Sequence, residues 1–459
     1  MADYQCVIIG GGPGGYEAAL RAAELGMKTA LIEKDKIGGT CLNRGCVPTK
    51  SLLHAAELVS SAKKAERYGA AADCSLISAK AIFDEKEHVV SELRNGVEGL
   101  LQDAGVDVMR GEGLVQGSGC VRIVLGEEER VITAGKILIA AGAKPFCPPI
   151  PGIELDGVIT SDDLLDGQPE IFESLVIIGG GVIGVELGLF YQELGTKVTI
   201  LEGMDRLLPN LDKEIGQNLA NILKKKGMEI YTRSMVSQIA HAKDQMAVTF
   251  QNRGEEKTVY AQKVLCAVGR IPCVKEVLDA GVTLEMEGRR IAVSESFETS
   301  IPGVYAIGDV SARIQLAHVA SAQGRACVER FAGFEPSENQ SVIPSCIFSR
   351  PEIACTGMSL EEAKKAGMEA EAGKYVMFSN SRTMIARTGR AFMKVVAEKG
   401  SHRILGAQLM CEHASDMLSE FTEAIVNEMT AEQMLKAIRP HPTFEEGVSS
   451  ALRDLLKRL

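Results

Sequence analysis

The sequence feature that most constrains the fold is an internal repeat of 28 residues. The segment VIIGGGPGGYEAALRAAELGMKTALIEK at 7–34 recurs as VIIGGGVIGVELGLFYQELGTKVTILEG at 176–203, and 14 of the 28 positions are identical. Each copy reads as an apolar strand, a glycine-rich turn, a helix with small and apolar residues at helical spacing, and a second strand that ends in an acid. This pattern predicts two doubly wound α/β units that bind dinucleotides.

Three glycines and one acid have separate physical roles in each copy. The first glycine permits a tight turn, the second lets the backbone approach a pyrophosphate, and the third lets the helix pack on the strand. The helix N-terminal amides then face the phosphate charge, and the acid can accept hydrogen bonds from an adenosine ribose. These residues are Gly10, Gly12, Gly15 and Glu33 in the first copy and Gly179, Gly181, Gly184 and Glu202 in the second.

The acid also bears on the choice of nucleotide. Turns that bind no ligand would explain the glycines, but they explain neither Glu33 nor Glu202. A carboxylate at the ribose repels the additional phosphate of NADP, which is instead accommodated by arginine. We therefore predict that the second copy prefers NAD.

Composition excludes several classes of partner. The 459 residues carry a formal charge of -11 and no block rich in Lys or Arg, which argues against nucleic acid or an acidic membrane surface. Charges, glycines or prolines interrupt each apolar stretch before it reaches the roughly 20 residues that cross a bilayer. The chain begins MADYQCVIIGGG, without the regions of a signal or transit peptide, so we expect no membrane partner and a cytoplasmic location.

The rest of the chain gives coarser expectations. Residues 51–110 have a helical pattern, and 119–145 alternate like short strands. The proline-rich stretch 145–152 is a plausible linker, and 299–310 contains another apolar strand. From about residue 341 the pattern predicts strands followed by a long amphipathic helix.

Cys41 and Cys46 form a close pair framed by glycines, whereas other cysteines, such as Cys266, lie singly in apolar segments and are expected to be buried and inert. If Cys41 and Cys46 lay in one regular helix, their Cα atoms would be about 7.5 Å apart, which is too far for a disulfide. A bond therefore requires Cys41 in the glycine-rich turn and Cys46 near a helix start, where Pro48 is favoured.

A redox-active disulfide is the favoured interpretation of this pair. A flavin could mediate between such a disulfide and NADH, since both exchange two electrons. The residues alone leave open two reduced core thiols or part of a metal site. No further metal ligand lies nearby at suitable spacing, and we predict no metal.

Several motifs together resemble the flavoprotein pyridine nucleotide-disulfide reductases, most closely the dihydrolipoamide dehydrogenases among them. They are GGTCLNRGCVPTKSLL, the repeated glycine motif, TSIPGVYAIGD, LAHVASAQG, PEIACTG and HPTFEE, and they cover essentially the whole chain. The resemblance implies an α/β fold with two Rossmann-like domains, for FAD and NAD, and a C-terminal α+β dimerisation domain. The expected segments are 1–147 (FAD, first part), 148–272 (NAD), 273–340 (FAD, central part) and 341–459 (dimerisation).

The resemblance also implies which residues form the sites. The residues expected to bind FAD are Gly10, Gly12, Gly15, Glu33, Lys34, Gly39, Thr40, Lys50, Gly113, Ala141, Gly142, Asp309, Leu316, Ala317 and His318. Those expected to bind NAD are Gly179, Gly181, Gly184, Glu186, Glu202, Val236 and Gly269. The residues expected in catalysis are Cys41, Cys46, Lys50, Glu186, His441 and Glu446.

In the implied reaction, Cys41 exchanges with dihydrolipoamide, Cys46 lies against the flavin, and Lys50 pairs with Glu186. His441, oriented by Glu446, acts as the base on the cysteine pair of the other subunit of a homodimer. The expected partner is a lipoyl-bearing protein of a 2-oxo acid dehydrogenase or glycine cleavage complex. Arg439 stands where the family usually has a second histidine.

Two alternatives remain open. One is an NAD(P)H-dependent reductase of another disulfide, such as glutathione. Glu202 argues against the use of NADPH. The other is a redox-sensing flavoprotein without turnover. The pair His441 and Glu446 argues against it, because a sensor needs no proton acceptor.

Overall fold

A computed structural model describes residues 2–70 and 78–459. The chain forms two compact units, each assembled from separate segments: 1–148, 159–171 and 266–340 in unit 1, and 149–158, 172–265 and 341–459 in unit 2. The four domain segments expected from the sequence stay predictions. No helix within the described ranges is both long and apolar enough to cross a membrane.

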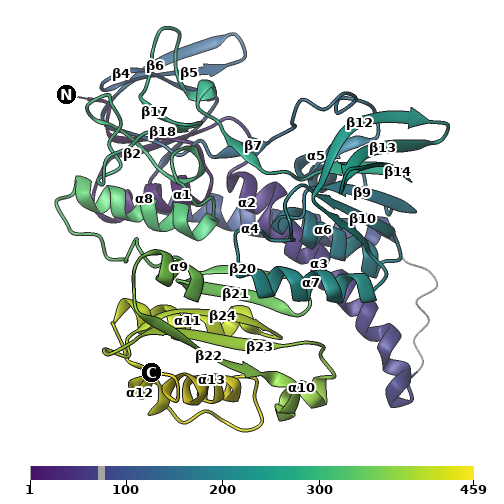
Figure 1. The fold of residues 1–459 in the computed structure, drawn as a ribbon. Coiled ribbons are helices and arrows are strands. Elements are labelled where there is room, and N and C mark those ends of the chain that lie inside the picture. The colour runs from purple at the N-terminus through teal and green to yellow at the C-terminus, as the bar shows by residue number, and fades with distance from the viewer. Residues whose placement is uncertain (1, 71–77) are drawn as a thin grey trace. The chain divides into compact units, whose positions relative to one another are not determined.

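Unit 1 is built on one sheet with the strand order β3-β2-β1-β6-β5-β4, in which β19 also pairs with β6 (Figure 1). β1, β2, β3, β6 and β19 are paired in parallel, whereas β4, β5 and β6 form an antiparallel meander. The strands are β1 (Tyr4–Ile9), β2 (Thr29–Glu33), β3 (Asp107–Arg110), β4 (Glu112–Gly117), β5 (Cys120–Leu125), β6 (Glu128–Ile139) and β19 (Val304–Ala306). The parallel strands β1 and β2 are almost wholly buried, as a sheet covered on both faces requires.

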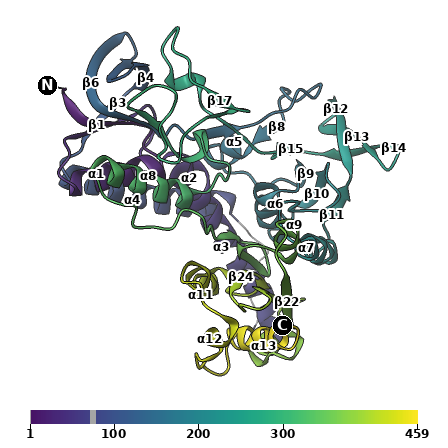
Figure 2. The same ribbon diagram turned by 60° about the vertical axis from the view of Figure 1, so that its left-hand side comes forward.

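The helices of unit 1 are α1 (Pro13–Glu24), α2 (Gly39–Arg44), α3 (Cys46–Lys64), α4 (Ala79–Asp103), α5 (Ser161–Asp166) and α8 (Ala317–Phe331), with short 3₁₀ helices at Ala65–Tyr68, Lys275–Val277 and Gly308–Val310. α1 and α8 lie side by side in both ribbon views (Figures 1 and 2). Their close packing needs glycine, because a Cβ on Gly324 would lie 2.4 Å from the Gly14 carbonyl oxygen. Short strands β7 (Ala143–Pro145) and β16 (Arg270–Pro272) pair antiparallel, as do β17 (Met286–Glu287) and β18 (Arg290–Ile291).

In the N-terminal part of unit 2, a sheet has the order β11-β10-β9-β15-β8, and a three-stranded antiparallel sheet has the order β12-β13-β14. Its strands are β8 (Val158–Thr160), β9 (Ser174–Ile178), β10 (Lys197–Glu202), β11 (Glu229–Thr232), β12 (Ser234–Ala242), β13 (Gln245–Asn252), β14 (Glu255–Ala261) and β15 (Lys263–Cys266), and its helices are α6 (Val182–Glu193) and α7 (Lys213–Lys225). β9 pairs in parallel with β10, and β10 with β11. Both glycine repeats therefore form the predicted strand, turn, helix and strand.

The C-terminal part of unit 2 is an antiparallel sheet in the order β20-β21-β24-β23-β22 (Figure 1). Its elements are β20 (Ser345–Ile347), β21 (Glu352–Gly357), α9 (Leu360–Lys365), β22 (Ala370–Val376), a 3₁₀ helix (Met377–Ser379), α10 (Ser381–Ala386), β23 (Phe392–Glu398), β24 (Ile404–Cys411), α11 (Ala414–Val426), α12 (Ala431–Leu435) and α13 (Glu446–Leu456). α11 packs on β21 and β24, and α13 packs on β22 and β23. This confirms the predicted α+β organisation of strands followed by an amphipathic helix.

One expectation about secondary structure is wrong in part. Residues 51–110 are helical in α3 and α4, but 107–110 form the edge strand β3 beside β2. The strand DVMR is mostly exposed, so its sequence lacks the apolar run of a buried parallel strand. The part of this prediction that falls on 71–77 lies outside the described residues.

Candidate functional site

The first glycine turn has the geometry of a phosphate cradle. Gly10 has φ +106°, and a Cβ there would lie 2.4 Å from the Ala140 carbonyl oxygen, so only glycine fits. A Cβ on Gly15 would lie 1.8 Å from the Gly10 carbonyl oxygen, which lets α1 approach the turn. Gly12, at the start of α1, has no protein atom closer to its Cβ position than 3.8 Å. Two glycines thus close the turn, and the third leaves backbone open to a ligand at a helix N-terminus.

The second turn repeats this arrangement. Gly179 has φ +110°, and a Cβ on Gly184 would lie 2.1 Å from the Gly179 carbonyl oxygen. Apart from its chain neighbours, no heavy atom of the described residues lies within 4 Å of the Cβ position of Gly181, the N-cap of α6. The N-terminus of α6 is therefore also open to a phosphate group.

The two acids hold their turns in the same way. Glu33 accepts hydrogen bonds from the backbone amides of Gly11 and Asp35, at 2.6 and 2.7 Å. Glu202 accepts from the amides of Gly180 and Met204, both at 2.6 Å. Both carboxylates are buried, with 8% and 7% exposure. An ionised carboxylate fixed by two amides keeps further lone pairs that can accept from a ribose hydroxyl.

A cavity of about 80 Å³ lies beside the first turn. Five of the predicted FAD residues line it, namely Gly10, Glu33, Lys34, Gly113 and Ala141. The sequence did not point to two further lining residues, Cys273 and Glu276, and Glu276 pairs with Lys144 at 2.5 Å. The cavity lies between the acid and the turn, where the ribose and phosphates of a bound dinucleotide are expected to contact the chain.

The cysteine segment begins directly against the first turn. The Gly38 amide donates to the Gly11 carbonyl oxygen at 2.8 Å, and a Cβ on Gly39 would lie 2.6 Å from the Gly12 Cα. The buried Asn43 side chain fixes this segment by donating to the carbonyl oxygens of Ile37 and Gly39, each at 3.0 Å. Two glycines and Asn43 therefore place α2 beside the nucleotide turn, and Asn43 is a positioning residue that sequence spacing did not reveal.

The expected location of Cys41 needs a correction. Cys41 lies in the short helix α2 rather than in the glycine-rich turn, and the break falls instead at Gly45. A Cβ on Gly45 would lie 2.8 Å from the Thr40 carbonyl oxygen, so glycine permits the chain to bend there. Cys46 is the first residue of α3, as predicted, with Pro48 in the first turn.

The two thiols differ in environment. Cys41 is half-buried and Cys46 is exposed, and both are thiols in this structure. A hydrogen bond with the Cys46 side chain, and then burial, raise the pKa of Cys41. Cys46 lies at the N-terminus of a 19-residue helix, whose unpaired amides stabilise a thiolate. Cys46 is therefore the better leaving group of the pair.

The remaining residues predicted to bind FAD also lie in unit 1. Gly142, with φ +70°, accepts at its carbonyl oxygen from the Cys273 amide at 3.0 Å. Leu316, Ala317 and His318 form the start of α8, and burial raises the pKa of the Asp309 carboxyl. Thr40 lies 3.4 Å from Arg270, which also contacts Asp162 and the Ala143 carbonyl oxygen at 2.9 and 2.7 Å. Arg270 is a site residue that the motifs did not indicate, although it is the only charged residue in VLCAVGRIP.

Three residues predicted to bind NAD lie outside the second glycine turn and its acid. Buried Glu186 in α6 accepts from the Phe348 amide at 2.9 Å. Val236 in β12 packs against a core that includes Ile178 and Leu201. Gly269, with φ +127°, lies in unit 1 rather than with the second turn. The ion pair of Lys50 and Glu186 stays a prediction, since it joins residues of different units.

His441 and Glu446 form a hydrogen-bonded pair. The Nδ1 atom of His441 lies 2.8 Å from Glu446 Oε1, and the other oxygen accepts from the Thr443 amide at 3.0 Å. That amide, followed by His441, lowers the pKa of Glu446. A carboxylate at Nδ1 leaves Nε2 of the exposed ring able to accept a proton. The pair therefore has the geometry of a base with its orienting acid.

Arg439 stabilises the segment that leads to His441. Its side chain, 5% exposed, pairs with Glu420 and donates to Ser449 at 3.0 Å. At position 439 the chain therefore has a buried arginine in an ion pair, where the family usually has a second histidine. Arg439 anchors the loop before His441.

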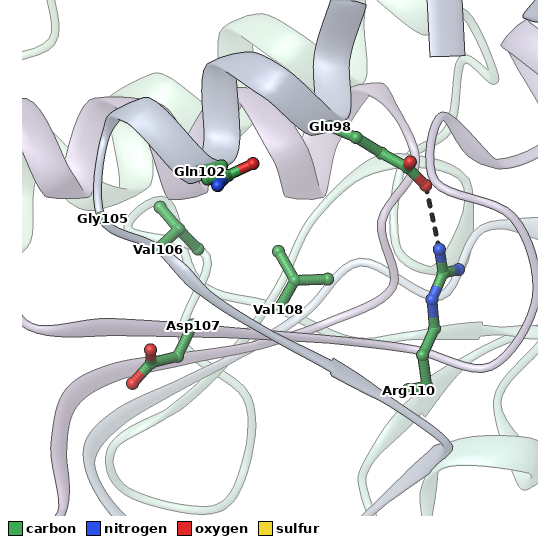
Figure 3. Close-up of a pocket in the computed structure, with 7 residues that line it drawn as sticks. All are labelled: Glu98, Gln102, Gly105, Val106, Asp107, Val108 and Arg110. Atoms are coloured by element: carbon green, nitrogen blue, oxygen red, sulfur yellow. Dashed lines mark hydrogen bonds and ion pairs between the residues drawn. The ribbon is translucent and has the colours of Figure 1, made fainter. Parts of the chain in front are cut away.

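A second hollow, of about 440 Å³, lies between α4 and β3 (Figure 3). Its lining includes Gln102, Asp107 and the ion pair of Glu98 with Arg110 at 2.9 Å, but none of the predicted site residues. Among the described residues, no group of three or more His, Cys, Asp or Glu side chains could hold a metal ion.

The two turns, their acids and the cysteine pair define a class: an oxidoreductase with two dinucleotide sites and an adjacent dithiol. Residues 4–324 match the family described as pyridine nucleotide-disulphide oxidoreductase, and residues 343–452 match the dimerisation domain of that family. The chain belongs to this family. Its cofactors are FAD and NAD(H), and the C-terminal match supports a homodimer.

Curated relatives and solved structures agree with this assignment. Dihydrolipoyl dehydrogenase of Bacillus subtilis is 36% identical, with 98% of this chain and 97% of the relative covered. Dihydrolipoyl dehydrogenase 3 of Pseudomonas putida is 37% identical, with 99% and 98% covered. The HOCl-induced flavoprotein disulfide reductase RclA of Escherichia coli has a TM-score of 0.86 at 28% identity, with 99% of both chains covered.

Proposed function

We propose that this protein is a dihydrolipoamide dehydrogenase, which oxidises dihydrolipoamide on a lipoyl-bearing protein and reduces NAD⁺. The observation that carries the proposal is the pair of His441 and Glu446, at 2.8 Å, in a chain that also has the Cys41 and Cys46 thiols in contact. A dithiol substrate needs both a proton acceptor and a disulfide. The full-length similarity to dihydrolipoyl dehydrogenases supports the same substrate.

In the proposed reaction, each catalytic residue has a separate role. Nε2 of His441 of the partner subunit takes the proton from one substrate thiol, and Glu446 stabilises the imidazolium. The substrate thiolate attacks Cys41 Sγ, the bond between Cys41 and Cys46 breaks, and Cys46 leaves as a thiolate. The second substrate thiol then displaces Cys41, so that lipoamide forms and both cysteines are reduced.

The electrostatics support this order. The raised pKa of Cys41 makes it the poorer leaving group, whereas the helix N-terminus favours the Cys46 thiolate. Gly12, Glu33 and their neighbours would hold FAD, which would supply the two-electron chemistry that links the dithiol to NAD⁺. Gly179, Gly181, Gly184 and Glu202 would hold NAD⁺.

Steady-state rates with matched variants test the proposal. Cys41→Ser should abolish lipoamide turnover and leave the protein yellow. His441→Gln should lower the rate by roughly 10²-fold or more, since general base catalysis contributes that much. His402→Gln is the control, because His402 makes a similar contact with Glu432 at 2.5 Å; it should keep the rate.

Other outcomes would point to the alternatives. A higher rate with oxidised glutathione than with lipoamide would indicate a reductase of another disulfide. Reduction by NADH without any turnover of lipoamide would indicate a redox sensor. A physiological partner in a 2-oxo acid dehydrogenase or glycine cleavage complex, and a cytoplasmic location, are parts of the same proposal.

A further inference from the structure

A second pair of cysteines, Cys147 and Cys266, lies outside the proposed catalytic site. Cys266 is the last residue of β15, and Cys147 follows β7 by two residues. Both belong to unit 1. Cys147 lies where the chain leaves unit 1 after Pro148, and Cys266 lies where it returns. The two cysteines therefore lie at the two ends of segment 147–266, which contains the second glycine repeat.

Backbone contacts hold the two cysteines beside each other. The Phe146 amide donates to the Gly269 carbonyl oxygen at 3.0 Å, and β7 pairs with β16 with Pro145 opposite Arg270. The Cys266 thiol donates to the Phe146 carbonyl oxygen at 3.6 Å. The Cys147 side chain also acts on the Cys266 thiol. The two side chains are thus neighbours where the chain leaves and re-enters unit 1.

The two thiols differ in access to solvent. Cys147 is exposed, whereas Cys266 is 2% exposed. Burial, followed by the neighbouring Cys147, raises the pKa of Cys266 to about 12. An oxidant can therefore reach Cys147 first, while Cys266 stays protected as a thiol. Such an arrangement suits an attacking cysteine with a resolving neighbour.

Another neighbouring pair, Cys6 and Cys327, lacks this combination. Cys6 and Cys327 are both fully buried, so no oxidant reaches either sulfur. Cys120 is half-exposed, but its thiol donates to the Gln116 side chain at 3.2 Å. Cys120 therefore provides a matched control.

We propose that Cys147 and Cys266 are a second redox site, which hydrogen peroxide converts reversibly into a disulfide. The Cys147 sulfur attacks one peroxide oxygen, the O–O bond breaks, and a sulfenic acid and one water form. The Cys266 sulfur then attacks Cys147, the S–O bond breaks, and a second water leaves as the S–S bond forms. Two thiols and one hydrogen peroxide give one disulfide and two waters, and an external thiol restores the reduced pair.

The bond would close a loop around the whole segment from 147 to 266. A cross-link over a loop of this length restricts the unfolded chain strongly. The oxidised protein should therefore unfold at a temperature several degrees above that of the reduced protein, and dithiothreitol should reverse the shift.

Peptide mapping of the holoenzyme tests the proposal. The protein is treated with equimolar hydrogen peroxide, alkylated and digested without reduction. We expect a peptide that links Cys147 with Cys266 in the wild type and in Cys120→Ser. Cys147→Ser should show no linked peptide and no thermal shift, and this exposed substitution should leave the fold intact.

Two results would overturn the proposal. One is recovery of Cys147 and Cys266 as separate alkylated residues while Cys41 and Cys46 are linked. The other is oxidation of Cys147 to a sulfinic acid without a linked peptide. Since Cys41 and Cys46 give a different peptide, either result leaves the proposed catalytic function untouched.

Discussion

The two glycine repeats share a skeleton but differ in what surrounds it. In both copies the first glycine of the turn has a φ near +110°, and the third glycine packs against its carbonyl oxygen. In both, the acid accepts a hydrogen bond at 2.6 Å from the amide of the residue after the first glycine. In the first copy, the Cα of Gly39 lies 3.8 Å from the Cβ position of Gly12. In the second copy, Gly181 has no such neighbour.

The helices differ as well. α1 has charged residues such as Arg21, which pairs with Glu329 of α8 at 2.9 Å, whereas α6 is buried from Gly184 through Tyr191. The repeat thus provides a phosphate cradle, and the segments packed against it set the chemistry. Among the described residues, a close pair of thiols lies beside the cradle in the first copy and not in the second.

The largest expected difference between the copies comes from Gly12→Val and Gly181→Val. Valine at 12 would contact Gly39 as well as occupy ligand space, so we expect loss of bound FAD and of all turnover. The Cβ of a valine at 181 has open space around it among the described residues. This variant should leave FAD bound, while the KM for NADH rises at least about tenfold through steric exclusion. Flavin absorbance and steady-state kinetics measure both effects. Equal loss of FAD in the two variants would contradict the assignment of the first turn to FAD and the second to NAD.

A smaller effect is expected from the acids. Glu202→Gln places an amide nitrogen against a backbone N–H, and hydrogen bonds to a charged group contribute about 1.5–3 kcal/mol. We expect NADH affinity to fall about tenfold or more and discrimination against NADPH to relax. Glu33→Gln should instead weaken FAD retention. The KM values for the two nucleotides and equilibrium dialysis of FAD provide the measurements, and unchanged nucleotide preference in Glu202→Gln would contradict the assignment.

The smallest effect concerns Asp309, which lies outside both repeats, in the 3₁₀ helix Gly308–Val310 of unit 1. Because burial raises its pKa in the folded state, the ionised carboxylate destabilises the protein as the pH rises above the usual aspartate range. Asp309→Asn should therefore stabilise the FAD-free protein at neutral pH, and the gain should vanish once the pH falls below that range. Thermal melts across pH test this; a constant gain at every pH would argue against the raised pKa.

The sequence predicted the elements whose determinants are local. The two repeats have their strands, turns, helices and acids as expected, since each role depends on residues close in the chain. The C-terminal strands and helix were likewise predictable from periodicity. The pair of His441 and Glu446 came from a five-residue spacing and the resemblance, and the structure places these two side chains in contact.

Features that depend on distant contacts could not be predicted. Asn43 accepts a hydrogen bond from Arg94 at 3.0 Å, and Arg270 contacts Thr40 and Asp162, all of which are contacts made only after folding. The helix around Cys41 was missed because a single residue, Gly45, separates it from the next helix. Cys147 and Cys266 lie 119 residues apart in the sequence, so no local pattern relates them.

The most direct test of the central claim is an anaerobic reductive titration of the FAD-loaded protein in a Cys147→Ser background, which removes the second cysteine pair. If Cys41 and Cys46 exchange electrons with the flavin, the protein should take up four electrons per FAD, two in the disulfide and two in the flavin. Cys41→Ser in the same background should take up two. An uptake of two electrons per FAD in both proteins would contradict the account.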